Sequence, residues 1–417
     1  MLHVLLILTA FLTAPVLGRA AESKGQSRPD SGNDPGLDYI DTSFENASPV
    51  WYELAPDGSI QVHLLYDHER ASPNRAAGHI HILLHGRTGA TLTLEFRNLD
   101  NVWNGQPASV AGELKTMMVS PDGHEWTPLP MESLPGNRVR LSVTMPGPRL
   151  YVARTEPYRL SDLDHLLASI RENPRVAITP IGRTVGGREL EIVEIGDSKA
   201  PHRVFLRARA HPWESGSSWV AHGLIQRLLK DDEDTRRFLA GYSVSILPMA
   251  NKDGVARGMT RFNARGKDLN RNWDTPADPA LSPENAALER WLEGRIAAGR
   301  GPHLALELHN DGRGLLHVSR PPVPNLERHL ERMATLEALL RKRTWFTEGS
   351  TSAAFRNSGT LGDGWLARYG IDAVVHEFNC NWIAGLQDYP SARHWRTYGE
   401  GLAEVFDEYF RLVKPKG

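Results

Sequence analysis

The sequence contains a single cysteine, Cys380, among its 417 residues, so no intrachain disulfide can form. It also lacks an excess of either charge, since 48 Lys and Arg residues are matched by 50 Asp and Glu residues, for a formal net charge of -2. We therefore expect no nucleic-acid partner, because phosphate backbones are bound by clustered basic side chains. Beyond the N-terminus no segment is apolar enough to span a bilayer, which takes roughly 20 apolar residues.

The first 20 residues are the apolar exception. Leu2–Leu17 is almost wholly apolar, and Gly18-Arg-Ala20 offers the small residues that a signal peptidase recognises. We predict a cleaved signal peptide over residues 1–20, hence a secreted or periplasmic protein with no stable membrane span; an uncleaved membrane anchor is the alternative. Residues 21–38 are rich in Ser, Gly, Asp and Pro, which predicts a flexible linker.

Short runs of alternating polar and apolar residues fill the next segment, residues 39–157. Ile60–Leu64, His79–Leu83, Thr91–Phe96 and Arg138–Val143 are examples. Alternation with period two, interrupted by Gly, Pro and Asn, is typical of antiparallel strands with one buried face. The segment is predicted to be a small antiparallel β-sandwich domain.

Residues 158–417 change to alternating helices and strands. Helical patterns cover 161–172, 217–229, 283–298, 325–343 and 392–412, and strand patterns cover 204–208, 244–247, 304–308 and 373–375. Alternation of this kind predicts an α/β domain with a mixed, largely parallel sheet flanked by helices.

Polar clusters follow four of these strands directly. They are His211-Pro-Trp-Glu214, Asn251-Lys-Asp-Gly254, His309-Asn-Asp311 and His376-Glu-Phe-Asn379. Ligand sites in open α/β sheets lie beyond the carboxyl ends of the strands, so these clusters are expected to converge.

Two imidazoles and one carboxylate form the ligand set of a catalytic zinc, with a further position left for water. His211 and Glu214 are three residues apart in a turn, and His309 can join them from a neighbouring strand. A carboxylate is then needed to move the proton from water to the leaving amine, and Glu377 is the candidate. Arg271 with Asn270, in the segment 267–273, can hold a carboxylate and so select a free C-terminus.

The order of these motifs resembles that of carboxypeptidase A-like zinc metallocarboxypeptidases. The motifs are His211-Pro-Trp-Glu214, Asn251-Lys-Asp-Gly254, Asp268-Leu-Asn-Arg-Asn-Trp273, Glu307-Leu-His309 and Glu377. Phe44-Glu-Asn-Ala47, Pro157-Tyr158 and residues 181–190 are similar to the cytosolic-carboxypeptidase-type branch, which has an N-terminal β-domain.

The resemblance implies a carboxypeptidase-like fold and roles for particular residues. It implies one zinc per chain on His211, Glu214 and His309, and Glu377 as the general base. It also implies that Asn270 and Arg271 bind the terminal carboxylate of peptide or protein substrates, and that Arg261 polarises the scissile carbonyl.

Two positions depart from the family pattern. The tyrosine that closes over the substrate in digestive members aligns with Phe355, which has no hydroxyl. The position at the side-chain pocket falls near Gly362, where glutamate-removing members carry Arg, and Asp363 beside it would favour a basic residue.

The predicted function is hydrolysis of the C-terminal peptide bond of peptides or proteins. A zinc-dependent deacylase of N-acyl amino acids and a peptidase of cell-wall peptide stems remain alternatives with the same metal set. A non-catalytic peptide-binding protein is the alternative from another class.

Overall fold

The computed structural model describes residues 34–352 and 359–413. The predicted signal peptide and most of the predicted linker lie outside the described residues. The first strand begins at Leu37, within the last two residues of the range predicted for the linker. Within the described ranges, no helix combines the length and the apolar composition that crossing a membrane requires.

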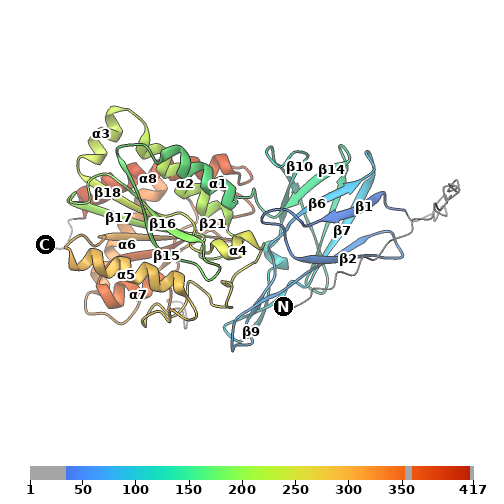
Figure 1. Cartoon of the computed structure of the whole chain (residues 1–417), viewed down its shortest axis with the longest axis horizontal. Coiled ribbons are helices and arrows are strands. Elements are labelled where there is room, and N and C mark those ends of the chain that lie inside the picture. Colours follow the sequence, from blue (N-terminus) through green and yellow to red (C-terminus); the bar gives the residue numbers. More distant parts are fainter. Residues whose placement is uncertain (1–33, 353–358, 414–417) are drawn as a thin grey trace, which may run out of the picture. The chain divides into compact units, whose positions relative to one another are not determined.

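The N-terminal part, which we term the β-region, consists almost wholly of strands (Figure 1). Its elements are β1 (Leu37–Asp41), β2 (Val50–Leu54), β3 (Ile60–Leu64), β4 (Asp67–His68), β5 (Arg75–Ala76), β6 (His81–Gly86), β7 (Thr91–Arg97), β8 (Asp100–Trp103), β9 (Gln106–Ser109), the 3-10 helix η1 (Ala111–Glu113), β10 (Thr116–Ser120), β11 (Thr127–Pro130), β12 (Glu132–Leu134), β13 (Arg138–Thr144) and β14 (Arg149–Ala153).

These strands form three sheets, in the orders β1-β6-β14-β10-β11, β12-β13-β7-β3-β2 and β4-β5-β8-β9. Alternate side chains face a shared core, as in β3, where Ile60, Val62 and Leu64 are buried. The predicted antiparallel, strand-rich region is confirmed, with one exception: β3 pairs with β7 in parallel. Strands β4 to β6 lie between these two in the chain, and such a long connection permits parallel pairing.

The C-terminal part alternates helices and strands. Its elements are α1 (Leu160–Ile170), β15 (Val176–Arg183), β16 (Glu189–Ile195), β17 (His202–Ala208), α2 (Ser215–Leu229), α3 (Glu233–Leu239), β18 (Tyr242–Leu247), α4 (Lys252–Ala256), α5 (Pro283–Ala297), β19 (Leu304–Asp311), β20 (Leu316–Val318), α6 (Leu326–Arg343), α7 (Leu361–Tyr369), β21 (Asp372–Asn379) and α8 (Ala392–Leu412).

A seven-stranded sheet in the order β15-β16-β18-β17-β19-β21-β20 organises this part. The central neighbours β18, β17, β19 and β21 are parallel, whereas β15, β16 and β20 pair antiparallel at the edges. The predicted mixed, largely parallel α/β sheet is therefore confirmed.

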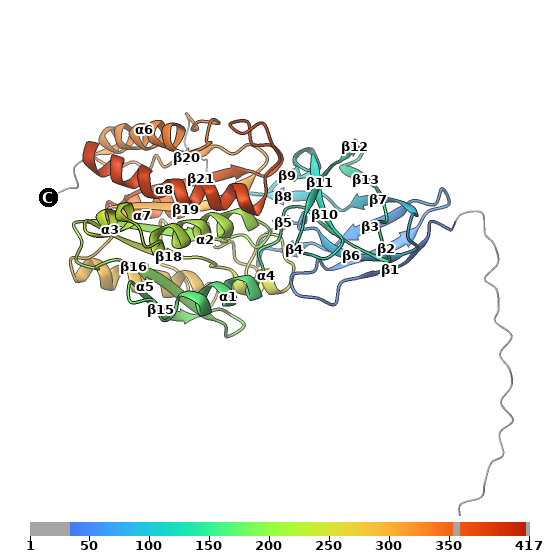
Figure 2. The same cartoon turned by 90° about the horizontal axis from the view of Figure 1, so that it is seen from above.

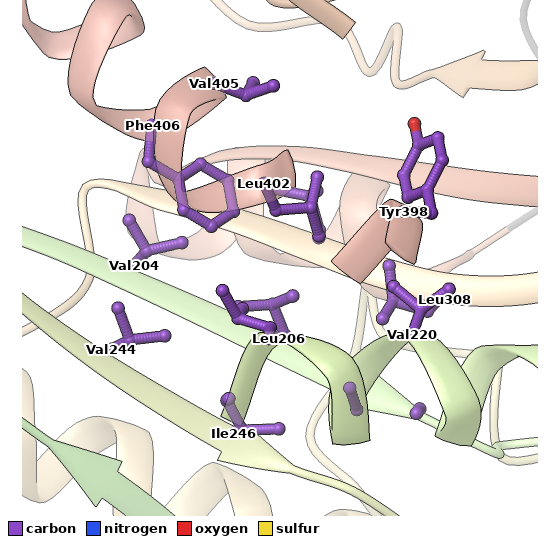
Figure 3. Close-up of a cluster of buried hydrophobic side chains, with 14 of the residues drawn as sticks. Val204, Leu206, Val220, Val244, Ile246, Leu308, Tyr398, Leu402, Val405 and Phe406 are labelled. Carbon is purple, nitrogen blue, oxygen red and sulfur yellow. The ribbon is translucent and has the colours of Figure 1, made fainter. Parts of the chain in front are cut away.

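Both faces of the sheet are covered by helices. Val204 and Leu206 of β17 point to one face, where they pack with Leu402 and Phe406 of α8 (Figure 3). Phe205, between them, points to the opposite core, which α5 and α7 contribute to. Figure 1 accordingly shows α2 and α8 on one side of the sheet and α5 and α7 on the other. Burial on both faces explains why nearly all residues of the central strands β17, β18 and β19 are buried.

Candidate metal centre and substrate cavity

The parallel strands bring the three predicted metal ligands to one edge of the sheet. His211 and Glu214 lie in the turn between β17 and α2, and His309 lies near the end of β19. Strands β17 and β19 are parallel neighbours, so their carboxyl ends meet at the same edge. The ligands therefore converge although 95 residues separate Glu214 from His309.

The carboxylate of Glu214 lies between the two imidazoles. Its Oε1 is 2.8 Å from Nδ1 of His211, and its Oε2 is 2.6 Å from Nδ1 of His309. One candidate ligand atom from each residue lies within 4.8 Å of the other two. All three side chains are buried, so few water molecules can compete for a cation bound there.

The far nitrogen of each imidazole has a carboxylate partner. Nε2 of His211 is 3.1 Å from Oδ1 of Asp268, and Nε2 of His309 is 3.1 Å from Oε1 of Glu307. An imidazole that donates its Nε2–H to a carboxylate presents an unprotonated Nδ1, which is the form that binds a metal. The three ligand side chains, with the carboxylates that face their imidazoles, therefore fit zinc.

The charge of Glu307 is itself balanced. Arg207 donates from Nε to Oε2 of Glu307 at 2.6 Å, and both side chains are almost completely buried. A buried carboxylate without such a partner would cost several kcal/mol. Arg207 thus keeps Glu307 ionised as the acceptor for His309.

The electrostatics of the three ligands follow from their contacts. Burial opposes the ionisation of Glu214, but the imidazoles of His211 and His309 outweigh it and hold the pKa of the carboxyl below its usual range. Burial likewise opposes the charge on His309, yet Glu214 raises the pKa of His309 well above its ordinary value. The pocket therefore favours a positive charge between these side chains, which a divalent cation supplies.

Two buried side chains hold the turn that carries His211 and Glu214. Arg209 adopts φ 62 and donates from Nε to the carbonyl oxygen of Pro212 at 2.6 Å. Asn251 accepts from the N–H of Gly254 and donates to the carbonyl oxygen of Ala210. The predicted cluster at Asn251 thus caps α4 and supports the metal turn from behind.

Glu377 lies beside the metal cluster on β21. It is the register partner of His309 on β19, and partners in adjacent parallel strands point to the same face. Burial and the neighbouring Asp311 raise the pKa of the Glu377 carboxyl well above its usual value. Ligand atoms of Glu377, Asp311 and His317 lie within 4.8 Å of one another.

A cavity of about 610 Å³ adjoins the cluster. Arg261, Asp268 and Arg271 line it, and Asp268 connects it to the metal cluster through its contact with His211. Arg261 donates to Oδ2 of Asp268 from Nε at 2.8 Å and lies 2.7 Å from it through Nη2. Two guanidinium groups beside the cluster equip the cavity for anionic groups.

Part of the chain that forms this site matches a known protein family. Residues 163–292 match the zinc carboxypeptidase family model. This segment is therefore similar to zinc carboxypeptidases. The zinc carboxypeptidase match contains His211, Glu214, Arg261, Asn270 and Arg271, whereas His309 and Glu377 lie beyond its end.

Curated relatives of the zinc carboxypeptidase segment resemble only part of this chain. Cytosolic carboxypeptidase 2 of Danio rerio is 32% identical over 138 residues, which cover 30% of this chain and 19% of that protein. Cytosolic carboxypeptidase 6 of Caenorhabditis elegans is 39% identical over 101 residues, covering 23% of this chain and 22% of that protein. The chain thus spans about a fifth of the length of these relatives.

Solved structures of metallo-carboxypeptidases share the fold over most of the chain. A metallo-carboxypeptidase from Burkholderia cenocepacia has a TM-score of 0.76 at 20% identity and covers 90% of this chain and 99% of its own. A metallo-carboxypeptidase from Pseudomonas aeruginosa, in complex with (2-guanidinoethylmercapto)succinic acid, has a TM-score of 0.71 at 21% identity, covering 89% and 100%. These similarities include the β-region.

Asn270 is placed differently from Arg271, its predicted partner in carboxylate binding. Arg271 lines the cavity, whereas the buried amide of Asn270 is turned towards His309 and α7. Its Nδ2 is 3.0 Å from Nε2 of His309, and its Oδ1 accepts from the N–H of Leu361 at 2.9 Å.

Gly362 and Asp363 lie in the first turn of α7. A side chain at Gly362 would meet Oγ of Ser319 at 2.4 Å, so glycine permits the close approach of this helix. Asp363 lines the cavity and accepts from the hydroxyl of Thr360 at 2.7 Å, as part of a capping box. Phe355 lies outside the described residues.

Sequence reasoning missed the contribution of the β-region to the cavity. Glu69, Trp103 and Asn104 line it together with residues of the C-terminal part. The only available signal was Asn104-Gly105, a dipeptide typical of a two-residue hairpin turn. Both residues have positive φ, as that turn requires. The signal locates a hairpin but says nothing about its neighbour in space.

Proposed function

We propose that this protein is a zinc-dependent metallocarboxypeptidase that hydrolyses the C-terminal peptide bond of peptides or proteins. One observation carries the proposal: the candidate ligand atoms of His211, Glu214 and His309 lie within 4.8 Å of one another beside an arginine-lined cavity. The fold similarity to metallo-carboxypeptidases supports it.

Zinc, held by His211, Glu214 and His309, would supply Lewis-acid polarisation of the scissile carbonyl and activation of water. The remaining chemistry belongs to side chains. Glu377 would take the proton from the attacking water and give it to the leaving amine, a role that suits a carboxyl whose pKa is raised. Arg261 would donate hydrogen bonds to the developing oxyanion.

Arg271 would hold the terminal carboxylate of the substrate. Its Nη1 donates to the carbonyl oxygen of Asn270, which orients the guanidinium in the cavity. Asn270 would add a second donor. When Nε2–H of His309 donates to Glu307, the Asn270 amide has no acceptor on that side, so its N–H groups would be left to donate to the substrate.

Gly362 and Asp363 would lie near the side chain of the residue released. Asp363 lines the same cavity as Arg271, and Glu69 and Asp274 add further carboxylates. This distribution of charge supports a preference for a basic C-terminal residue, because opposite charges in a partly buried cavity attract.

We also infer export, from the apolar segment 1–20. The curated relatives are named cytosolic, so the inference depends on this segment alone. Sequencing the N-terminus of the protein recovered from cell fractions tests it, and an intact Met1 on cytosolic protein would refute it.

The activity is tested by the release of single residues from a mixed peptide library, with and without a chelator. Matched peptides ending in a free acid or in an amide test the carboxylate clamp. Equal cleavage of both would exclude a carboxypeptidase, and preference for small N-acyl amino acids would identify a deacylase.

A further inference from the structure

The small sheet β4-β5-β8-β9 of the β-region contributes to the candidate active site. Trp103 at the end of β8 and Asn104 in the following turn line the cavity. Figure 2 shows β4, β5, β8 and β9 close to one another within the β-region. Strand β4 of this sheet borders the segment that carries Arg261, because Asp67 accepts hydrogen bonds from the backbone of that segment.

Asp67 of β4 holds the backbone at Arg261. Its Oδ2 accepts from the N–H of Arg261 at 2.7 Å and from the N–H of Phe262 at 2.8 Å. The side chain is buried, and its Oδ1 accepts no hydrogen bond from the described residues. A buried carboxyl group is costly, so these two bonds are the evident compensation for keeping it there.

Trp103 and Asp268 contact the guanidinium group of Arg261. The guanidinium carbon of Arg261 lies 4.5 Å from the centre of the Trp103 ring, a distance typical of a cation–π contact. Asp268, in the segment between α4 and α5, also binds the guanidinium and contacts His211. The position of Arg261 relative to the metal cluster thus depends on both parts of the chain.

We propose that Asp67 and Trp103 are positioning residues for Arg261, so that the β-region sets the geometry of carbonyl polarisation. The inference rests on the proposed carboxypeptidase function. Asp67 fixes the backbone and Trp103 fixes the plane of the guanidinium. A displacement of about 1 Å in such a group can cost on the order of 100-fold in rate.

The test compares Asp67→Ala with Asp67→Asn. Alanine removes the acceptor, whereas asparagine keeps one oxygen for both N–H groups. We expect Asp67→Ala to lower kcat by about 10- to 100-fold with little change in KM, and Asp67→Asn to retain most activity. Asp100→Ala is the matched control, because Asp100 lies in the same sheet and pairs with Arg75 instead.

A double-variant cycle separates positioning from general damage. In an Arg261→Ala background, Asp67→Ala is expected to have no further effect on kcat. An equal loss in both backgrounds would overturn the proposal, since Asp67 would then act independently of Arg261.

Hydrogen exchange provides a readout that does not depend on activity. Asp67→Ala is expected to speed exchange of the amides of residues 261 and 262, and Asp67→Asn to restore slow exchange. Unchanged exchange would overturn the proposal. If the wild type released no residue from any peptide while exchange behaved as expected, the proposed function would fail and the anchoring by Asp67 would stand.

Discussion

At the scale of single residues, the candidate site is a set of paired buried charges. Glu214 lies between two imidazoles, and Asp268 and Glu307 occupy their far nitrogens. Each of these carboxylates fixes a proton on Nε2, so the Nδ1 atoms of both imidazoles are the ones that can bind a metal. Among the described residues, Glu377 accepts no hydrogen bond from a basic side chain at Oε2, as its proposed role in proton transfer requires.

Glu377→Gln is expected to lower kcat by about 10²- to 10⁴-fold, because an amide cannot accept the proton. Zinc content should stay at one ion per chain, measured by elemental analysis alongside peptide release. Glu404→Gln, in the exposed face of α8, is the control. Loss of zinc in the Glu377 variant would mean that ligand and base have been exchanged.

Arg271→Ala is expected to raise KM for peptides with a free C-terminus. Loss of a charged hydrogen bond is worth about 1.5–3 kcal/mol, or roughly 10- to 150-fold in kcat/KM. The kcat/KM for peptide amides should fall much less, so the ratio of kcat/KM for free-acid peptides to kcat/KM for peptide amides should decrease. Arg265→Ala, at an exposed position of the same loop, should leave the ratio unchanged. An unchanged ratio in the Arg271 variant would refute the role of Arg271 in binding the terminal carboxylate.

At the scale of elements, close contacts between backbones set the position of the helices. Helices α2 and α8 approach each other through glycine: a Cβ at Gly399 would lie 2.0 Å from the carbonyl oxygen of Val220. The helix that begins after Glu214 is therefore held in place by α8.

Gly399→Ala is expected to destabilise the protein by about 1–3 kcal/mol, because the contact is with backbone that cannot move aside cheaply. Gly294→Ala is the matched control: it also lies in a helix, with no atom within 4 Å of an added Cβ. That control should be stabilised by up to about 1 kcal/mol, through helix propensity. Chemical denaturation measures both, and a stabilised Gly399 variant would show that α8 can shift.

The small sheet carries a pH-dependent group. Burial raises the pKa of Asp67 from 3.8 to about 6, against the opposing effect of its backbone hydrogen bonds and Arg261. Because the folded protein holds the Asp67 proton more tightly than the unfolded chain does, the free energy of unfolding is highest below pH 3.8. It falls as the pH rises towards about 6, where the folded protein loses this proton. Asn does not titrate, so the free energy of unfolding of Asp67→Asn minus that of wild type should increase between pH 4 and pH 7, by up to about 3 kcal/mol. Denaturation at both pH values checks this, and parallel curves would contradict the burial argument.

At the scale of the whole molecule, the candidate metal centre joins segments that are distant in the chain. Strand β19, the β17–α2 turn and the segment between α4 and α5 that carries Asp268 meet only when the central sheet is formed. A cation that binds this assembled site and not the unfolded chain must stabilise the fold.

Removal of zinc is expected to lower the melting temperature and abolish peptide release together. At a free zinc concentration of 100 times Kd, the stabilisation is about 2.7 kcal/mol. Calorimetry before and after chelation, followed by zinc addition, measures the effect. A His309→Ala variant should show a much smaller response to zinc, and an equal response would place the ion elsewhere.

The sequence by itself determined the α/β class, the central strands and the order of the polar clusters. Apolar runs of β17 and β19 and the period of α8 are local patterns, so they could be read without tertiary information. The short elements β20, α4 and α7 were not predicted, because few residues leave little periodic signal. The ligand set was predicted because carboxyl ends of parallel strands converge, whatever their separation along the chain.

Only the tertiary structure decided which partners those residues have. The amide of Asn270 faces His309, and the backbone of Arg261 is held by Asp67, which is 194 residues away. No local pattern marks Asp67, since a two-residue strand has no periodicity and its acceptor role exists only when β4 meets the loop. Contacts between remote segments depend on how the two parts of the chain pack, which sequence periodicity does not encode.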